Sequence, residues 1–368
     1  MRGRTIANLS VLVLILNLVL AWPVRAYLPD LTPMTIAEPG SPVLLNPGFE
    51  CGDGYHDQPG IHGMVPKGWT ASILAGGDPF MASTQMWATM SCDPSDMTWE
   101  KLEGHDSNIF MAAYASYGQD FASPPFDLVL YQPVSADPGT PYSLSAWMTS
   151  LCGGSATPSD CPQDAYIAKR AGMDPTGGVD PTAPSVVWME DRRPHTEVRW
   201  ANLSLATTAQ GPALTIFIRA VSPFRHHGNH VFADAVKLVR APTSRFTILA
   251  SHANSIDIAW TGELGSDIAA IPAGNYRLTF DVQVQAGEAP WQDLLTEQDA
   301  GSHTFAAPPS CFDRTYRFRV RSMAKQVVGQ RGAWPDHRFV GVWVESAPVT
   351  VMHVLTCRHS VRLPLVFK

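Results

Sequence analysis

The densest cluster of titratable side chains in the chain is the segment His226-His-Gly-Asn-His230. Neutral imidazole nitrogens bind transition metals, and they also hydrogen-bond to sugar hydroxyls. A zinc site needs three or four ligands, and a loop with this spacing supplies two or three. A solvated or ligand-contacting loop is therefore the first interpretation, with His227 and His230 as the contacts. A metal site is the alternative.

A second polar segment, Asp174-Pro-Thr-Gly-Gly-Val-Asp-Pro181, places two carboxylates on either side of a glycine pair. Gly177 and Gly178 allow positive φ, and neither proline can donate to a sheet, so this segment is a tight loop. A structural turn alone explains the pattern. The alternative is that Asp174 and Asp180 lie near a ligand or an ion.

Several aromatic residues could stack on the apolar C–H face of a sugar ring. Trp147 and Trp200 lie inside strand-like patterns, which indicates a core role. Trp87 and Trp99 lie in an irregular, Met-rich region, and Trp188 follows the glycine-pair loop. We expect these last three residues to contact a ligand.

The motifs of common enzyme classes are absent from the sequence. There is no G-x-S-x-G, no H-E-x-x-H, no phosphate-binding loop and no dinucleotide fingerprint. Carboxylate pairs for glycoside hydrolysis could come from Glu100 with Glu103 and Asp106, or from Glu190 with Asp191. Their polar surroundings favour exposed surface acids, so we predict no catalytic residue and keep a glycoside hydrolase as an alternative.

Residues 1–26 have the pattern of a secretory signal peptide. Arg2 and Arg4 precede the apolar run Val11–Trp22, and Val24 and Ala26 suit a small-residue cleavage site. The apolar run is too short to span a bilayer comfortably, although an uncleaved anchor is the alternative. We expect a mature chain that begins near residue 27, has no transmembrane segment and is secreted or held at the cell surface.

The composition favours strands over helices. Charged residues make up only 16% of the chain, which has 31 Pro and 28 Gly, whereas surface helices need many charged positions. The formal net charge is −7 at pH 7, and the signal peptide removes three further basic residues. We therefore expect neither nucleic acid nor an anionic membrane as a partner.

The chain has six cysteines. An even number of cysteines in a chain that we expect to be exported favours disulfides over free thiols. The sequence does not choose among the many possible pairings, and no Cys/His cluster has zinc spacing. We expect Cys51–Cys92, Cys152–Cys161 and Cys311–Cys357, a set in which each pair stays within one apparent domain.

Residues 43–240, after a polar lead-in at 27–42, form a series of short strand-like runs. In Tyr142-Ser-Leu-Ser-Ala-Trp147, for example, apolar side chains alternate with serines. The runs are Asn108–Ala115, Leu128–Ala136, Tyr142–Ser150, Ala165–Arg170, Val186–Glu190, Glu197–Thr207, Ala213–Val221 and Phe232–Val239. About eight strands without an amphipathic helix predict a two-sheet β-sandwich of jelly-roll type.

A second series of strands follows a boundary between Arg240 and Thr243. Within Thr315–Arg321, Tyr316, Phe318 and Val320 face one way and polar groups face the other, as in a half-buried antiparallel strand. The other runs are Ser255–Thr261, Tyr276–Gln285, His303–Ala306 and Pro348–His353. We predict a smaller sandwich over residues 243–355 and a C-terminal tail over 356–368.

Short framework motifs of the first region resemble galactose-binding-like carbohydrate-binding modules. They occur in the same order as in that family: Asn46-Pro-Gly-Phe-Glu50, Val65-Pro-Lys-Gly-Trp69, Tyr131-Gln-Pro-Val134, Tyr142–Trp147 and Phe232-Ala-Asp-Ala-Val-Lys-Leu238. The resemblance implies a jelly roll that binds carbohydrate, but framework motifs do not specify the glycan.

The same resemblance implies a structural calcium ion. The family often holds calcium between the opening Glu and an Asp of the closing strand, which correspond here to Glu50 and Asp234. The family's closing strand frequently has two acidic residues, and here the first position is Ala233. Ordinary carboxylates bonded to backbone N–H groups are the alternative.

The second region resembles fibronectin type III domains. Trp260 matches the core tryptophan of an early strand, and Tyr316 matches the tyrosine of a late strand. Such modules are spacers and adhesion platforms, and the fold itself implies no chemistry. The end, Leu363-Pro-Leu-Val-Phe-Lys368, looks like short tails of exported bacterial proteins; a final edge strand is the alternative.

Together these patterns predict an all-β chain of two antiparallel β-sandwiches after a signal peptide: a jelly roll and a smaller, immunoglobulin-like fibronectin type III sandwich. The predicted function is non-catalytic attachment to extracellular or cell-surface polysaccharide. A structural envelope protein that makes protein contacts is the first alternative, and a glycoside hydrolase is the second.

Overall fold

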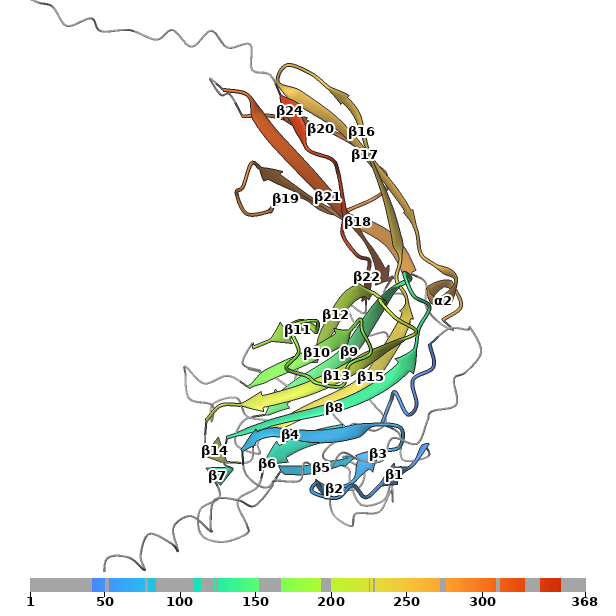
Figure 1. Cartoon of the computed structure of the whole chain (residues 1–368), viewed down its shortest axis with the longest axis vertical. Helices are drawn as coiled ribbons and strands as arrows, with labels where there is room; N and C mark the ends of the chain where they lie inside the picture. The colour runs from blue at the N-terminus through green and yellow to red at the C-terminus, as the bar shows by residue number, and fades with distance from the viewer. Residues whose placement is uncertain are drawn as a thin grey trace, which may run out of the picture. The chain divides into compact units, whose positions relative to one another are not determined.

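The regular secondary structure of the described part of the chain is almost entirely β-strand, as Figure 1 shows. The computed structural model describes residues 42–49, 53–76, 79–83, 109–113, 122–123, 125–151, 167–192, 200–224, 226–227, 229–271, 276–308, 312–327 and 338–351. In these ranges α2 (Ser266–Ala269) is the single α-helix. The all-β prediction is confirmed.

Several predictions concern residues outside those ranges. They are the signal peptide, the C-terminal tail, the six cysteines, Glu50, Trp87, Trp99 and the acidic group Glu100, Glu103 and Asp106. Across the part of the chain that is described, no helix is long and apolar enough to cross a membrane.

Two antiparallel sheets build the first sandwich. The five-stranded sheet has the order β11-β10-β13-β8-β4, with strands β4 (Thr70–Gly76), β8 (Phe126–Ser135), β10 (Ala168–Asp174), β11 (Val187–Asp191) and β13 (Ala213–Ser222). The six-stranded sheet has the order β12-β9-β15-β6-β5-β2, with strands β2 (His62–Gly63), β5 (Pro79–Ser83), β6 (Ile109–Ala113), β9 (Pro141–Leu151), β12 (Ala201–Thr208) and β15 (His230–Arg240). Only β2 and β5 pair in parallel among these strands.

Two small ribbons complete this half of the chain. β1 (Tyr55–His56) pairs with β3 (Val65–Pro66), and β7 (Ala122–Ser123) pairs with β14 (His226–His227).

The core of the first sandwich lies between its two large sheets. Because side chains alternate across a strand, β8 sends Leu128 and Leu130 into this core, and β9 sends Leu144, Ala146 and Met148. The residues between them point to the opposite face of each sheet, away from this core.

The opening motif closes one end of this core. The Trp69 indole N–H donates to the Leu45 carbonyl at 2.9 Å, and the Trp69 ring packs against Phe49 with centroids 5.4 Å apart. The Gln132 side chain accepts from the Leu45 N–H at 2.7 Å and donates to its carbonyl at 3.0 Å. These contacts tie the opening segment to β4 and β8 and so hold the framework together.

The second sandwich also has two sheets. One has the order β16-β17-β20, with β16 (Thr243–Ser251), β17 (Ser255–Glu263) and β20 (Gly301–Ala306). The other has the order β19-β18-β21-β22, with β18 (Tyr276–Ala286), β19 (Gln292–Gln298), β21 (Arg314–Gln326) and β22 (Arg338–Val340). β23 (Val344–Glu345) and β24 (Val349–Val351) also pair with β21.

The core of the second sandwich contains both residues that carry the fibronectin resemblance. Trp260 and Tyr316 are buried there with Phe280 and Phe318. Between the two sandwiches, Ala241 donates its N–H to the Pro141 carbonyl at 2.9 Å. Only this residue and Pro242 separate β15 from β16.

Candidate functional site

One line of residues crosses the five-stranded sheet of the first sandwich. Trp188 on β11 pairs with Gly172 on β10, Gly172 pairs with Phe217 on β13, and Phe217 pairs with Tyr131 on β8. Directly paired residues point to the same face of a sheet. Trp188, Phe217 and Tyr131, which we name the aromatic row, therefore lie together on the face opposite the core.

Gly172 lets the indole lie over the backbone of β10. A Cβ atom at Gly172 would come within 2.6 Å of Trp188 Cε3, so only glycine leaves room for the ring. The Trp188 and Phe217 ring centroids are 5.7 Å apart, and those of Phe217 and Tyr131 are 6.1 Å apart. Phe217 is buried, whereas Trp188 and Tyr131 stay partly exposed. Phe217 packs in a buried cluster with Val129 and Val186, so Trp188 and Tyr131 are the two rings of the row that reach solvent.

Charged side chains border the aromatic row. Arg219 donates to Asp127 through two hydrogen bonds, at 2.8 and 2.6 Å, and its Cζ lies 5.7 Å from the centre of the Trp188 ring. On the neighbouring strands, Arg170 donates to the Glu190 carboxylate. After these pairings, the arginines still have N–H groups that can donate, and the carboxylates still have oxygen lone pairs that can accept, beside the aromatic rings.

The Glu190 carboxylate is held in its charged form. Burial alone raises the pKa of Glu190, but hydrogen bonds from Arg192 and Arg170 outweigh that effect, and the net shift is downward. Asp191 follows Glu190 on the same strand and points to the opposite face, where it pairs with Lys169. The two acids therefore do not face one cleft as a hydrolytic pair would.

The two aspartates of the glycine-pair loop differ in burial and in contacts. Asp174 is 1% exposed, and its carboxylate accepts from the Thr176 N–H at 2.8 Å and from the Ser185 hydroxyl at 3.1 Å. Asp180 is exposed and accepts from the Thr182 hydroxyl and N–H, which lower its pKa. The turn interpretation accounts for the contacts of Asp174, whereas Asp180 presents an ionised carboxylate to solvent.

The histidine segment lies in two strands. The backbone of His227 belongs to β14, and that of His230 belongs to β15, where it pairs with Ala112 and Leu151. Their side chains lie outside the described part of the structure, so their role as ligand contacts stays a prediction. Among the described residues, no group of three or more His, Cys, Asp or Glu side chains could hold a metal ion.

Asp234 lies at an irregularity of the closing strand. The register of β15 against β9 shifts between Asp234 and Lys237, and Ala235 has a φ of 48°. Asp234 is buried and accepts from the Ala235 N–H at 2.5 Å, while the Val236 N–H donates to the Pro47 carbonyl at 2.9 Å. Burial lowers the pKa of Lys237, and the Asp234 charge opposes part of that shift.

Of the predicted aromatic contacts, Trp188 is the one that the structure describes, and it lies in the aromatic row. Tyr131, Phe217 and Gly172 were not predicted from the sequence as parts of a site. Tyr131 falls in a framework motif, although the alternation of Val129 and Tyr131 with buried leucines is a usable sign that they share the outer face. No local pattern shows that β11, β10, β13 and β8 are neighbours.

No protein family matches the chain, and no curated protein matches it. Among solved structures, it is similar to the carbohydrate-binding module TmCBM61 in complex with β-1,4-galactotriose, at 15% identity over 54% of this chain and 97% of that one, with a TM-score of 0.31. It is also similar to the enzymatically active domain of bacteriophage CBA120 tailspike protein 4, at 12% identity over 47% and 19%, with a TM-score of 0.28. A family 4 carbohydrate-binding module aligns at 13% identity over 53% and 97%, with a TM-score of 0.25. TM-scores of this size do not establish a shared fold, and the architecture above rests on the strands of this chain.

Proposed function

We propose that this chain is a secreted, non-catalytic protein that binds polysaccharide on the aromatic row. The observation that carries the proposal is Trp188, whose indole lies over Gly172 and beside Phe217 while staying partly exposed. Aromatic faces of this kind stack on the apolar C–H face of a sugar ring.

The charged border supplies the second half of sugar recognition. Hydroxyl groups of a sugar need donors and acceptors beside the stacking surface, and Arg219, Arg170 and Glu190 lie there. The carboxylates of Asp127 and Glu190 are both held by arginines. The arginines keep Glu190 in its charged form, so it is not set up as a proton donor, which favours binding over hydrolysis.

A glycan array probed with the purified chain tests this proposal. We expect saturable binding of the wild type to one class of glycan. Trp188→Ala should bind that glycan about tenfold more weakly, because aromatic residues contribute most of the binding energy at many interfaces. Trp291→Ala is the matched control, since Trp291 is partly exposed but stacks on Arg319 in the second sandwich. Silence across the array, or equal losses in both variants, would contradict the proposal.

A structural calcium ion at Glu50 and Asp234 is the second part of the proposal. The bond between Val236 and Pro47 supports it, because it ties the strand that carries Asp234 to the segment that leads into Glu50. We expect a chelator to lower the melting temperature of the first sandwich, since removal of the ion leaves carboxylates without their counter-charge. Differential scanning calorimetry with chelator and with added calcium measures this. An unchanged melting curve would remove the ion from the proposal.

A further inference from the structure

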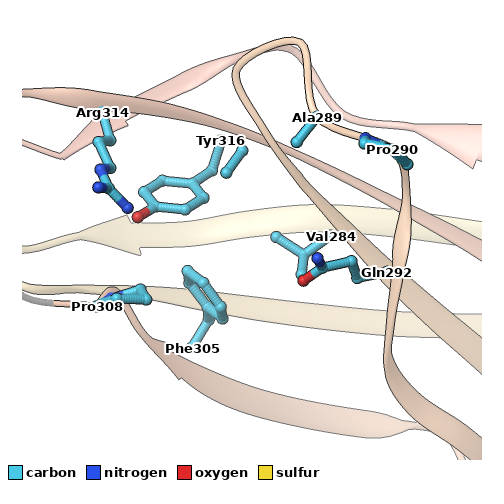
Figure 2. Close-up of a pocket in the computed structure, with 9 residues that line it drawn as sticks. Val284, Ala289, Pro290, Gln292, Phe305, Pro308, Arg314 and Tyr316 are labelled. Carbon is cyan, nitrogen blue, oxygen red and sulfur yellow. The ribbon is translucent and has the colours of Figure 1, made fainter.

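A pocket of about 290 Å³ opens in the second sandwich, away from the aromatic row. Its walls come from four strands and one turn: Val284 on β18, Gln292 on β19, Phe305 on β20, Tyr316 on β21 and Pro290 in the turn between β18 and β19. Figure 2 shows these side chains around the Tyr316 ring. The volume lies at the lower end of the range for small-molecule sites.

Two residues of the apolar walls also belong to the hydrophobic core of the second sandwich. Phe305 meets Tyr316 edge-on, with ring centroids 5.1 Å apart, and both belong to the core of the second sandwich. On the pairing strand, Ala286 lies directly opposite Tyr316, and its small side chain leaves room in front of the ring. The pocket is therefore bordered by paired strands of the sandwich.

Two polar groups meet at one end of this apolar pocket. Tyr316 is 2% exposed, and its buried hydroxyl has no hydrogen-bond partner within the described part of the chain. Arg314 lies two residues earlier on β21, on the same face, and in Figure 2 its guanidinium reaches the side of the ring where the hydroxyl lies. Among the described residues, no carboxylate forms an ion pair with Arg314.

We propose that this pocket binds a small organic carboxylate with an apolar body. The carboxylate accepts from the Tyr316 hydroxyl and from the Arg314 guanidinium, which gives the buried hydroxyl the partner that it lacks. The apolar body fills the space between Phe305, Val284 and Pro290. An inorganic anion would leave those walls without a partner, and an ammonium ligand would face a like charge. This site is independent of the proposed polysaccharide site.

Titration calorimetry of the full chain with phenylacetate and with phenylacetamide tests the charge requirement. The two probes have the same ring and nearly the same shape, but only phenylacetate carries a carboxylate. We expect saturable binding of phenylacetate and about tenfold weaker binding of phenylacetamide. Equal affinities, or no binding of either probe, would overturn the proposal.

Three variants locate the binding on these residues. Arg314→Gln should weaken phenylacetate binding about tenfold, whereas Arg317→Gln should leave it unchanged, because Arg317 lies on the same strand but on the opposite, exposed face. Tyr316→Phe should weaken binding several-fold and yet raise the melting temperature of the ligand-free protein, since it removes an unpartnered buried hydroxyl. A lower melting temperature for Tyr316→Phe, or equal losses for the two arginine variants, would count against the site.

Discussion

Gly172 shapes the candidate site by having no side chain. The Trp188 ring occupies the space where a Cβ would otherwise lie, and this brings the indole against Phe217. A glycine inside a strand weakens the strand by itself, and a neighbouring aromatic ring that covers it compensates for this. Gly172 has no side chain with which to bind a ligand, yet it sets the position of Trp188, the ring proposed to stack on one.

Gly172→Ala should accordingly lower both glycan affinity and stability. The new methyl group displaces the indole, at a cost of about 1–3 kcal/mol. Gly211→Ala is the control, because a Cβ at Gly211 would have the Thr176 carbonyl oxygen, 3.9 Å away, as its nearest heavy atom. Denaturant unfolding and glycan titration of the two variants measure the effect. Similar stability losses at both positions would contradict the role given to Gly172.

Glu190 provides a prediction about pH. Its pKa in the folded protein lies below the ordinary value of 4.5, so its ion pairs stabilise the fold at any pH above 4.5. That contribution is lost as the pH falls through the folded-state pKa. Wild type should therefore exceed Glu190→Gln in stability by a constant amount above 4.5, and the difference should shrink in more acidic solution. Urea unfolding across this range measures it, and a difference that grows toward acid would contradict the assignment.

At the scale of elements, Lys169 connects strands from both sheets of the first sandwich. Its side chain is fully buried, its ammonium donates to the Ser150 hydroxyl on β9 at 3.2 Å, and it lies 3.6 Å from the Asp191 carboxylate on β11. The charge sits on the core-facing side of β10, where alternation would call for an apolar residue. The ammonium reaches both partners because β9, β10 and β11 meet there.

Breaking this pair should cost more than removing it. Lys169→Met leaves the buried Asp191 carboxylate without its cation, which should lower the free energy of unfolding by about 3–5 kcal/mol. The double variant with Asp191→Leu should recover most of that loss, because no buried charge remains. Denaturant unfolding of the two single variants and the double variant forms the cycle. A double variant as unstable as the sum of the singles would contradict this account.

Strand positions were largely predictable, but their partners were not. The runs Tyr142–Ser150 and Ala213–Val221 match β9 and β13 to within a residue or so at each end, because alternation is a local signal. β19 lacks that signal, since most of its side chains are exposed and polar at a sheet edge. The strand register that places Trp188 beside Gly172 pairs two separate strands, so the sequence pattern of either strand alone does not predict it.

At the scale of the whole molecule, the two sandwiches have separate cores. Ile216 is fully buried in the first core and Ile258 in the second, and the two clusters share no residue. A third buried cluster joins Val239 on β15 to Ala324 and Phe339 of the second sandwich, and the Val340 N–H donates to the Ser143 hydroxyl at 3.0 Å. We expect each of the two larger cores to unfold as its own cooperative unit, because they share no buried residue.

Calorimetry should resolve two unfolding transitions. Ile216→Val and Ile258→Val remove the same methylene group, at about 1 kcal/mol each, and each should lower only the transition of its own sandwich. Phenylacetate should raise the transition that Ile258→Val lowers, because a ligand stabilises the unit that binds it. A single transition that both variants lower equally would show one cooperative unit instead.

The short connection between β15 and β16 has a mechanical consequence. Ala241 and Pro242 are both hydrogen-bonded, the second through its carbonyl to the Ser322 hydroxyl at 2.8 Å. Two residues span at most about 7 Å even when extended, so the connection has almost no spare length. If the first sandwich binds polysaccharide as proposed, a pull on the chain would load the second sandwich at once. The force would then be borne by the ladders of backbone hydrogen bonds in β15 and β16, rather than absorbed by an uncoiling linker.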